Sequence, residues 1–239
     1  MTELLYQLDS YLQAFDARIV GIDEEKNAVV LDRSAFYPGG GGQPCDQGTL
    51  TSDGKIYPVR KVQKSGGSIL HLLEGTDLPA PGAEVTGQLD WDRRYQLMRT
   101  HTAMHILCGV VWRDFGAQVT GGDMEPLKGR MDFEFETMQR ELVHTIEERI
   151  NQEVAAGRDL RVNILPRQEA FQIPDLIRTK INLLPEGIEQ VRTVEIVGLD
   201  LQADGGTHVH NTSEVGQLRV LDYKSKGAIN KRIYLEVAS

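Results

Sequence analysis

The sequence predicts an α+β protein in which a small β-barrel-like domain is followed by a domain with a mostly antiparallel sheet and helices. Residues 1–90 consist of short apolar runs separated by glycine-rich turns, a pattern typical of a small barrel or sandwich. After Asp90 the apolar residues recur first at helical spacing and later at strand spacing. Helices followed by a run of strands indicate an α+β domain. We therefore expect two domains, at residues 1–90 and 91–239.

Short strands are expected throughout the first domain. Two of them flank the turn-like Asp23–Asn27 and form a predicted hairpin, and SDGK, KSGG and EGTD turns separate the later ones. The expected strands are Arg18–Ile22, Ala28–Leu31, Thr49–Leu50, Ile56–Val62, Ile69–Leu73 and Glu84–Leu89.

The second domain is expected to contain two clear helices. Asp92 is the predicted cap of a helix that runs to Val111 or its neighbours. The other helix is expected at Thr137–Ala156, because its apolar residues recur at three- and four-residue steps and Gly157 supplies a stop. The expected strands are Arg130–Phe135, Leu160–Leu165, Val191–Val197, Gln217–Tyr223 and Arg232–Val237.

The composition limits the class of protein. The chain has 239 residues, two cysteines and a formal net charge of −9. So few cysteines argue against a disulfide framework and suit a reducing cytoplasm, which is the expected location. No apolar run reaches the length of about 18 residues that a membrane span needs, and no secretory signal is expected. An acidic protein is a poor general binder of nucleic acid, so RNA contact would depend on local basic patches.

The segment RTHTAMHILC contains the first candidate metal ligands. His101 and His105 are four residues apart on a predicted helix, so both imidazoles project from one face. This spacing is common in zinc sites, although two histidines on a half-buried helix face would look the same. Cys108 follows on the same side, but about 10 Å along the axis from His101. We therefore expect Cys108 to pack in the core, and Cys45 to lie in a loop without binding metal.

The segment QADGGTHVHN contains the second group of candidates, Asp204, His208 and His210, after an apolar strand. Zinc sites often combine a close pair of ligands from one element with ligands from a distant one. Four of the six histidines lie in these two segments. From the residues alone, a histidine-rich metal site and an ordinary polar turn both remain open.

Four segments of the chain resemble a known family. DWDRRYQLMRTHTAMHIL and DLQADGGTHV are similar to the editing domain of alanyl-tRNA synthetases and the related domain of threonyl-tRNA synthetases. SAFYPGGGGQPCDQG and DSYLQAFDARI resemble the freestanding versions of that domain, the AlaX-type alanyl-tRNA editing proteins of medium length. The likeness begins near Leu8 and continues to the C-terminus.

The resemblance implies a cytoplasmic hydrolase that deacylates tRNA(Ala) mischarged with serine, or in some members glycine, with Zn²⁺ in its site. In the family, the zinc ligands come from an H-x-x-x-H helix and a later C-x-x-x-H segment. Carried over by position, His101, His105 and His208 match, and Asp204 stands where the family has cysteine. A carboxylate can also bind zinc, so the fourth ligand is either Asp204 or water, with His210 as a spare candidate. Whether zinc activates water or anchors the terminal adenosine stays open.

The resemblance also points to residues that contact the substrate. GAQVTGGDM lies where the family has a polar strand facing the pocket, so we expect Gln118 and Thr120 to recognise the serine hydroxyl. Ordinary strand-surface polarity is the alternative for both. Contact with tRNA phosphates is expected from two basic groups: Arg93, Arg94, Arg99, Lys128 and Arg130, and Lys224, Lys226, Lys231 and Arg232.

The stretch FYPGGGGQPCDQG sets four glycines before Gln43. A simple turn needs only one or two glycines, whereas a run of residues without Cβ permits close approach of the backbone to a partner. We therefore expect Gly41, Gly42 and Gln43 to contact the catalytic half or the tRNA end. The alternative is a flexible hairpin tip.

Three other functions remain open at this point. The chain could hydrolyse another ester or amide with zinc, or it could be a zinc-containing nucleic-acid-binding module without catalysis. Structural zinc sites are usually rich in cysteine, whereas the candidates here include none. Peptide release factors also use a Gly-Gly-Gln loop, but they lack the paired-histidine domain. The oligomeric state and the choice between serine and glycine are not determined by the sequence.

Overall fold

The structure is a computed structural model that describes residues 2–178 and 187–238. Its chain divides into two compact units, residues 1–95 and 96–239. The α+β class and the mostly antiparallel sheets are as predicted. Among the described residues, no helix combines the length and the hydropathy of a membrane span.

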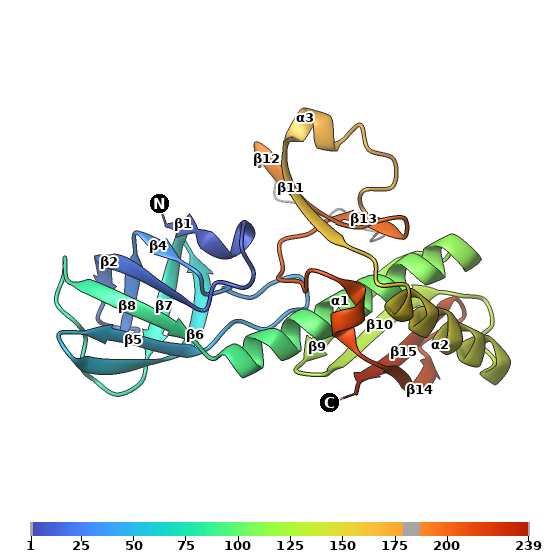
Figure 1. Cartoon of the computed structure of the whole chain (residues 1–239), viewed down its shortest axis with the longest axis horizontal. Helices are drawn as coiled ribbons and strands as arrows, with labels where there is room; N and C mark the ends of the chain where they lie inside the picture. The colour runs from blue at the N-terminus through green and yellow to red at the C-terminus, as the bar shows by residue number, and fades with distance from the viewer. Residues whose placement is uncertain (1, 179–186, 239) are drawn as a thin grey trace. The chain divides into compact units, whose positions relative to one another are not determined.

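The first unit contains a closed barrel of six strands, coloured from blue to green in Figure 1. Each strand pairs antiparallel with its neighbours. Side chains alternate between exposed and buried through β8 (Glu84–Leu89) and the first part of β2 (Ala14–Asp23). The predicted barrel is therefore confirmed. In barrel order, the strands are β2 (Ala14–Asp23), β3 (Ala28–Leu31), β7 (Ser68–Leu73), β6 (Lys55–Ser65), β5 (Gly48–Ser52) and β8 (Glu84–Leu89).

Two very short strands lie beside the barrel strands in sequence. β1 (Glu3–Leu4) pairs in parallel with β4 (Arg33–Ser34), and the 3-10 helix η1 (Leu5–Gln7) follows β1. These elements were not expected from the sequence, because two or three residues are too few to show a periodicity.

The glycine stretch between β4 and β5 forms a tight loop with an unusual backbone. All four glycines, residues 39–42, have positive φ, between 60° and 133°. The Gly40 N–H donates to the Gln43 carbonyl and the Gln43 N–H donates to the Gly40 carbonyl, each at 3.0 Å. The Tyr37 hydroxyl also donates to the Gly40 carbonyl, at 2.9 Å. The run of glycines is thus needed for backbone conformation, because other residues adopt positive φ only at a cost.

A buried ion pair closes the base of this loop. The Asp46 carboxylate accepts from the Tyr37 N–H at 2.6 Å and from Arg94 Nε at 3.0 Å, and it also receives Arg94 Nη2. Arg94 is fully buried and donates further to the carbonyls of Ser10 and Ala35. The prediction that Arg94 contacts RNA phosphates is therefore wrong, because its guanidinium group is buried and hydrogen-bonded within the first unit.

Helix α1 (Trp91–Phe115) starts in the first unit and continues into the second. The Oδ1 atom of Asp90 accepts from the Arg93 N–H at 3.1 Å, so Asp90 caps the helix. The predicted cap, Asp92, is wrong: this residue lies in the first turn, where its negative charge faces the positive end of the helix dipole.

The second unit contains a four-stranded antiparallel sheet. Met104 of α1 lies against one face of this sheet, where a Cβ on Gly122 or Gly129 would be 3.1 or 2.9 Å from the methionine side chain. These two glycines let the helix approach the β9–β10 hairpin closely. The strand order is β14 (Leu218–Ser225), β15 (Asn230–Val237), β10 (Lys128–Glu134) and β9 (Val119–Glu125).

Helix α2 (Arg140–Ala155) packs beside β14, as Figure 1 shows. It begins later than the predicted Thr137, because Gln139 has extended backbone angles and serves as the N-cap. The predicted stop is confirmed: Gly157 has a φ of +61°. The 3-10 helix η2 (Thr212–Val215) follows a capping box formed by Asn211 and Glu214.

A separate three-stranded antiparallel sheet completes the second unit. The strands predicted at Leu160–Leu165 and Val191–Val197 are confirmed as its first two members. A short helix α3 (Arg167–Ala170) follows the first strand. The strand order is β11 (Leu160–Pro166), β12 (Gln190–Ile196) and β13 (Asp200–Ala203).

The Arg94–Asp46 ion pair gives a prediction for stability. Arg94→Leu leaves the buried Asp46 carboxylate without its cation, and the free energy of unfolding should fall by about 3–5 kcal/mol. Arg18→Leu is the control, because Arg18 pairs with Glu84 in solvent, with 60% and 84% of the two side chains exposed. The loss in free energy of unfolding caused by Arg18→Leu should stay below about 1 kcal/mol. Urea unfolding measures both, and equal small losses would contradict the assigned role of Arg94.

Candidate metal centre

Three histidines and one aspartate gather in the second unit. His101 and His105 come from α1, while Asp204 and His208 come from the segment that follows β13. One ligand atom of each lies within 4.8 Å of the ligand atoms of the other three. The three imidazoles are almost completely buried, and 14% of the Asp204 side chain is exposed. The two sequence segments thus meet at one point.

The imidazoles surround a common centre. The ring of His101 is 5.0 Å from that of His105 and 4.2 Å from that of His208, centroid to centroid. Asp204 Oδ2 lies 3.0 Å from His208 Nε2, and Asp204 Oδ1 lies 3.6 Å from His101 Nε2. The arrangement depends on the helical period of α1, which places residues four apart on the same face.

The backbone around Asp204 fixes its carboxylate. The Asp204 N–H donates to the Arg192 carbonyl of β12 at 3.1 Å, and Arg192 Nη1 donates to the Asp204 carbonyl at 2.9 Å. The Gly206 N–H donates to Asp204 Oδ2 at 2.7 Å. The tight Asp-Gly-Gly turn therefore aims the carboxylate at the imidazoles.

Thr102 holds the other ring nitrogen of His208. Its Oγ1 lies 3.2 Å from His208 Nδ1 and accepts from the Val209 N–H at 3.3 Å. Thr102 is fully buried on α1. A hydroxyl can donate to the imidazole or accept from it, so it can serve either tautomer.

Burial sets the protonation of two of the imidazoles. It holds the pKa of His101 well below its ordinary value, although the Asp204 charge opposes this, and it lowers the pKa of His208 to about 4. Both rings are therefore neutral at neutral pH, which is the form that binds a metal. Burial alone would lower the pKa of His105 as well, but the Asp200 and Asp204 carboxylates outweigh it and raise that pKa.

Burial and the neighbouring groups shift the pKa of Asp204 in opposite directions. Desolvation by itself would raise the pKa of Asp204, but the surrounding imidazoles and the hydrogen bond with His208 hold it well below its ordinary range. The carboxylate is thus ionised at neutral pH.

The donor set fits a divalent metal ion. Imidazole nitrogen and carboxylate oxygen are both ordinary zinc ligands, and four such groups converge here. Nδ1 of His105 is buried and makes no hydrogen bond among the described residues. The cluster is therefore a group of residues that could hold a metal, as the sequence predicts for His101, His105, Asp204 and His208.

The predicted serine-sensing residues lie at the start of β9. Gln118 and Thr120 are exposed on either side of the buried Val119. The register shifts here, because Asp132 pairs with Gly121 whereas Phe133 pairs with Val119, so Thr120 is the extra residue of a β-bulge. Its hydroxyl donates to Asn230 Oδ1 at 2.9 Å. Their roles in discrimination stay predictions.

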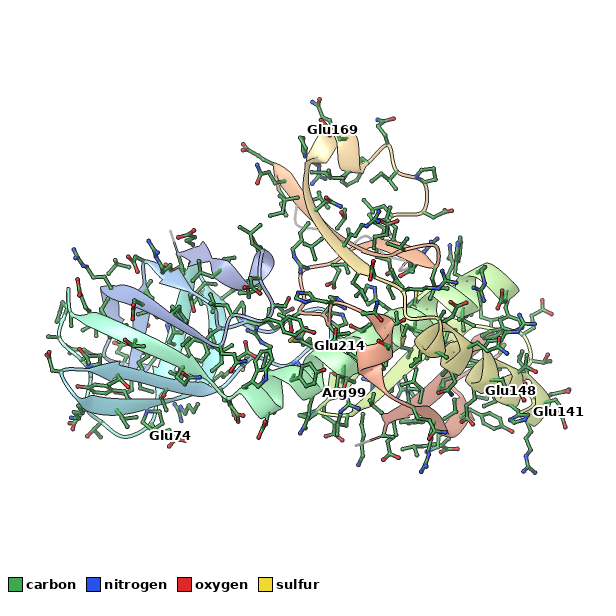
Figure 2. The ribbon with its side chains drawn as sticks, viewed as in Figure 1. Glu74, Arg99, Glu141, Glu148, Glu169 and Glu214 are labelled. Carbon is green, nitrogen blue, oxygen red and sulfur yellow. The ribbon has the colours of Figure 1, made fainter. Side chains whose placement is uncertain are left out.

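Arg99 connects α1 to the C-terminal segment. Figure 2 shows it close to η2, the helix that carries Glu214, and its Nε donates to the Val215 carbonyl at 3.0 Å. Its Nη2 donates to the Ala238 carbonyl at 2.6 Å. These bonds give Arg99 a structural role in the second unit, and its contact with substrate stays a prediction. So does that of the loop residues Gly41, Gly42 and Gln43.

Two other candidate ligands are placed away from the cluster. Cys108 is buried in the core as predicted, and its sulfur accepts from Gln202 Nε2 at 3.3 Å. His210 is exposed and lies in a bend two residues after His208. The group that could hold a metal does not include it.

The predicted basic patches are only partly on the surface. Lys231 is buried and donates to the carbonyls of Gly227 and Ala228, so its prediction as an RNA contact is wrong. Arg232 makes two hydrogen bonds to Asp132, at 2.6 and 2.7 Å. Exposed or half-exposed positions are held by Arg93, Lys128, Arg130, Lys224 and Lys226.

Three residues that support the ligands were not expected from the sequence. Thr102, Arg192 and Asp200 each touch a member of the cluster through a side chain. Thr102 is three residues before His105, so the helical period allows it to reach the same site, but a threonine is not a typical metal ligand and gives no signal of its own. Arg192 and Asp200 lie in strands of the three-stranded sheet, and local spacing does not reveal which helix that sheet approaches.

Two family models match parts of the chain. Residues 11–93 match the model described as tRNA synthetases class II (A). Residues 191–234 match the model described as threonyl and alanyl tRNA synthetase second additional domain. The first match covers the barrel, and the second contains Asp204 and His208.

Several characterised proteins are similar over nearly the whole chain. An alanyl-tRNA editing protein AlaX-M of Saccharolobus solfataricus is 41% identical over 241 aligned residues, which cover 99% of each chain. An AlaX-M of Methanosarcina barkeri is 38% identical, with 98% of each chain covered. An alanine–tRNA ligase of Ignicoccus hospitalis is 39% identical over 92% of this chain, which corresponds to 24% of the ligase.

The geometry of the cluster predicts how much metal each variant binds. His101→Ala and Asp204→Ala should lower bound zinc below the roughly one ion per chain that four converging ligands predict for the unsubstituted protein. His210→Ala is the control, since that side chain is exposed outside the cluster. It should retain the metal. Mass spectrometry of the native protein measures the stoichiometry, and loss of zinc in His210→Ala alone would refute this ligand assignment.

Proposed function

Because the chain belongs to the AlaX-M family of alanyl-tRNA editing proteins, we propose that it deacylates tRNA(Ala) mischarged with serine, and also accepts glycine. The observation that carries this proposal is the convergence of His101, His105, Asp204 and His208. The AlaX-M relatives are covered over 98–99% of their length, so the proposal concerns the whole chain.

Zn²⁺ is the metal that we propose for this site, held by the three imidazoles and the Asp204 carboxylate. When bound, zinc can polarise an ester carbonyl, lower the pKa of a bound water or anchor the terminal adenosine. The protein supplies three of these ligands already in the required form, with His101 and His208 neutral and Asp204 ionised. Low pKa values of His101 and Asp204 remove most of the competition from protons at neutral pH.

Discrimination against correctly charged Ala-tRNA(Ala) requires recognition of one hydroxyl. We propose that Gln118 and Thr120 contribute to it, since both are polar and exposed at the start of β9. A site that hydrogen-bonds a substrate hydroxyl leaves its own polar groups unpaired when the hydroxyl is missing. That difference favours serine over alanine.

The proposed partner is tRNA(Ala), which carries its charge on phosphates. A net charge of −9 opposes binding to RNA in general, so contact must come from local cations. Lys128, Lys224 and Lys226 are exposed in the strands β10 and β14 and the turn after β14. We propose that they contribute phosphate contacts, which position the RNA without specifying it.

Hydrolysis of defined aminoacyl-tRNAs tests this function. The protein should deacylate Ser-tRNA(Ala) at least about 100-fold faster than Ala-tRNA(Ala), because only the former offers the hydroxyl. Gly-tRNA(Ala) is measured in the same assay and should be hydrolysed more slowly than Ser-tRNA(Ala). Release of labelled amino acid at several protein concentrations gives kcat/KM for each substrate.

Three variants give that assay its controls. His101→Ala should abolish hydrolysis, and Gln118→Ala or Thr120→Val should narrow the difference between serine and alanine. Hydrolysis of a small seryl ester at an equal rate would favour the alternative of a general esterase. If no mischarged tRNA is deacylated, the proposed function is wrong. If metal-free His101→Ala protein keeps full activity, the proposed role of zinc is wrong and the proposed hydrolysis stands.

The glycine loop offers a matched comparison within the barrel unit. Gly41 and Gly66 have similar φ values, +60° and +53°, and a Cβ added to either meets open space. Alanine at either position should therefore cost a similar backbone strain, of about 1 kcal/mol. If the loop contacts the tRNA, Gly41→Ala should lower kcat/KM for Ser-tRNA(Ala) and Gly66→Ala should not. Equal effects on both activity and thermal unfolding would make the loop a structural turn.

A further inference from the structure

The candidate ligand His105 faces a second carboxylate outside the cluster. Its Nδ1 lies 3.4 Å from Asp200 Oδ2, which is within ion-pair distance but outside hydrogen-bond geometry. Nδ1 is buried and makes no hydrogen bond within the described part of the chain. Since Nδ1 is turned to Asp200, the other nitrogen, Nε2, is left for the cluster.

Asp200 is itself held in place. Its side chain is completely buried at the start of β13. Gln202 Nε2 donates to Oδ2 at 2.6 Å, and Arg178 Nε donates to Oδ1 at 3.4 Å. A buried carboxylate with both oxygens contacted cannot turn away from its neighbour without leaving donors unpaired.

The absence of a side chain at Gly109 of α1 lets Asp200 lie close to His105. Gly109 follows His105 by four residues and lies on the same helix face. A Cβ on Gly109 would lie 2.9 Å from Leu199 Cγ and 3.0 Å from Asp200 Cβ. The chain that enters β13 therefore passes close to the helix at Gly109, one turn from His105.

We propose that Asp200 is a positioning residue for the metal centre, acting through His105. It accepts the Nδ1–H of His105, which fixes the tautomer with a free lone pair on Nε2 and fixes the plane of the ring. Metal-bound histidines usually donate their second N–H to a carboxylate or carbonyl, and loss of that partner weakens metal binding. Arg178 and Gln202 hold the carboxylate, and Gly109 provides the space. This inference rests on the proposed zinc site.

Metal affinity separates this role from simple core packing. Zn²⁺ dissociation constants are measured by competition with a chromogenic chelator, and Co²⁺ is used as a spectroscopic probe of ligand geometry. Asp200→Asn should weaken Zn²⁺ binding by about 10- to 100-fold and change the Co²⁺ absorption bands. The control is Asp132→Asn, which removes another buried aspartate that is ion-paired with Arg232 in the same unit. Its Zn²⁺ affinity should stay within about twofold of the unsubstituted protein, within the error of such a competition.

A second variant keeps the carboxylate but moves it. Gly109→Ala should push Asp200 away from His105 and weaken Zn²⁺ binding, as Asp200→Asn does. Thermal unfolding verifies that both variants are folded. Should Asp200→Asn fail to fold, the Zn²⁺ affinity of Gly109→Ala decides whether Asp200 positions His105. Unchanged Zn²⁺ affinity in a folded Asp200→Asn protein would overturn the positioning role and leave the zinc site intact. If the unsubstituted protein itself binds no Zn²⁺, the zinc proposal fails and this inference fails with it.

Discussion

The second unit depends on how closely other elements can approach α1. The helix carries His101 and His105, and its neighbours reach it where side chains are missing. Gly122 and Gly129 of the β9–β10 hairpin accept Met104 on one side, and Gly109 on the helix itself admits the chain at Asp200 on another. A Cβ at Gly129 would lie 2.9 Å from Met104 Sδ, and one at Gly109 would lie 2.9 Å from Leu199 Cγ and 3.0 Å from Asp200 Cβ, so the facing side chains would have to shift. The glycines therefore allow the close packing that surrounds the histidine pair.

Burial gives this cluster its chemical character. Three imidazoles taken out of water favour their neutral form, which accounts for the low pKa values of His101 and His208. A single ionised carboxylate among them supplies the negative charge that a divalent ion requires. Exposed histidines at the same spacing would be hydrated and partly protonated near neutral pH, so their affinity for metal would be lower.

Much of this organisation could be predicted from local patterns, and the exceptions have physical causes. The barrel strands, α1 and the ligand candidates follow from periodicity and spacing, which are local. The Arg94–Asp46 pair joins residues that are far apart in sequence, so Arg94 looked like a surface cation. The bulge at Thr120 depends on register with β10, and the supporting residues Thr102 and Asp200 depend on which elements meet. These contacts arise only after the chain has folded.

Asp204 illustrates what a carboxylate offers at a position where the resemblance predicts cysteine. A thiolate has one sulfur to give, whereas this carboxylate has two oxygens with different surroundings. Oδ2 accepts the Gly206 N–H at 2.7 Å and also lies 3.0 Å from His208 Nε2, while Oδ1 lies 3.6 Å from His101 Nε2. Both oxygens therefore face the imidazoles, and one of them is also bonded to the turn. The Asp-Gly-Gly turn thus orients the carboxylate by the same backbone N–H that makes the turn tight, and the ionised carboxylate supplies the negative charge that a thiolate would supply.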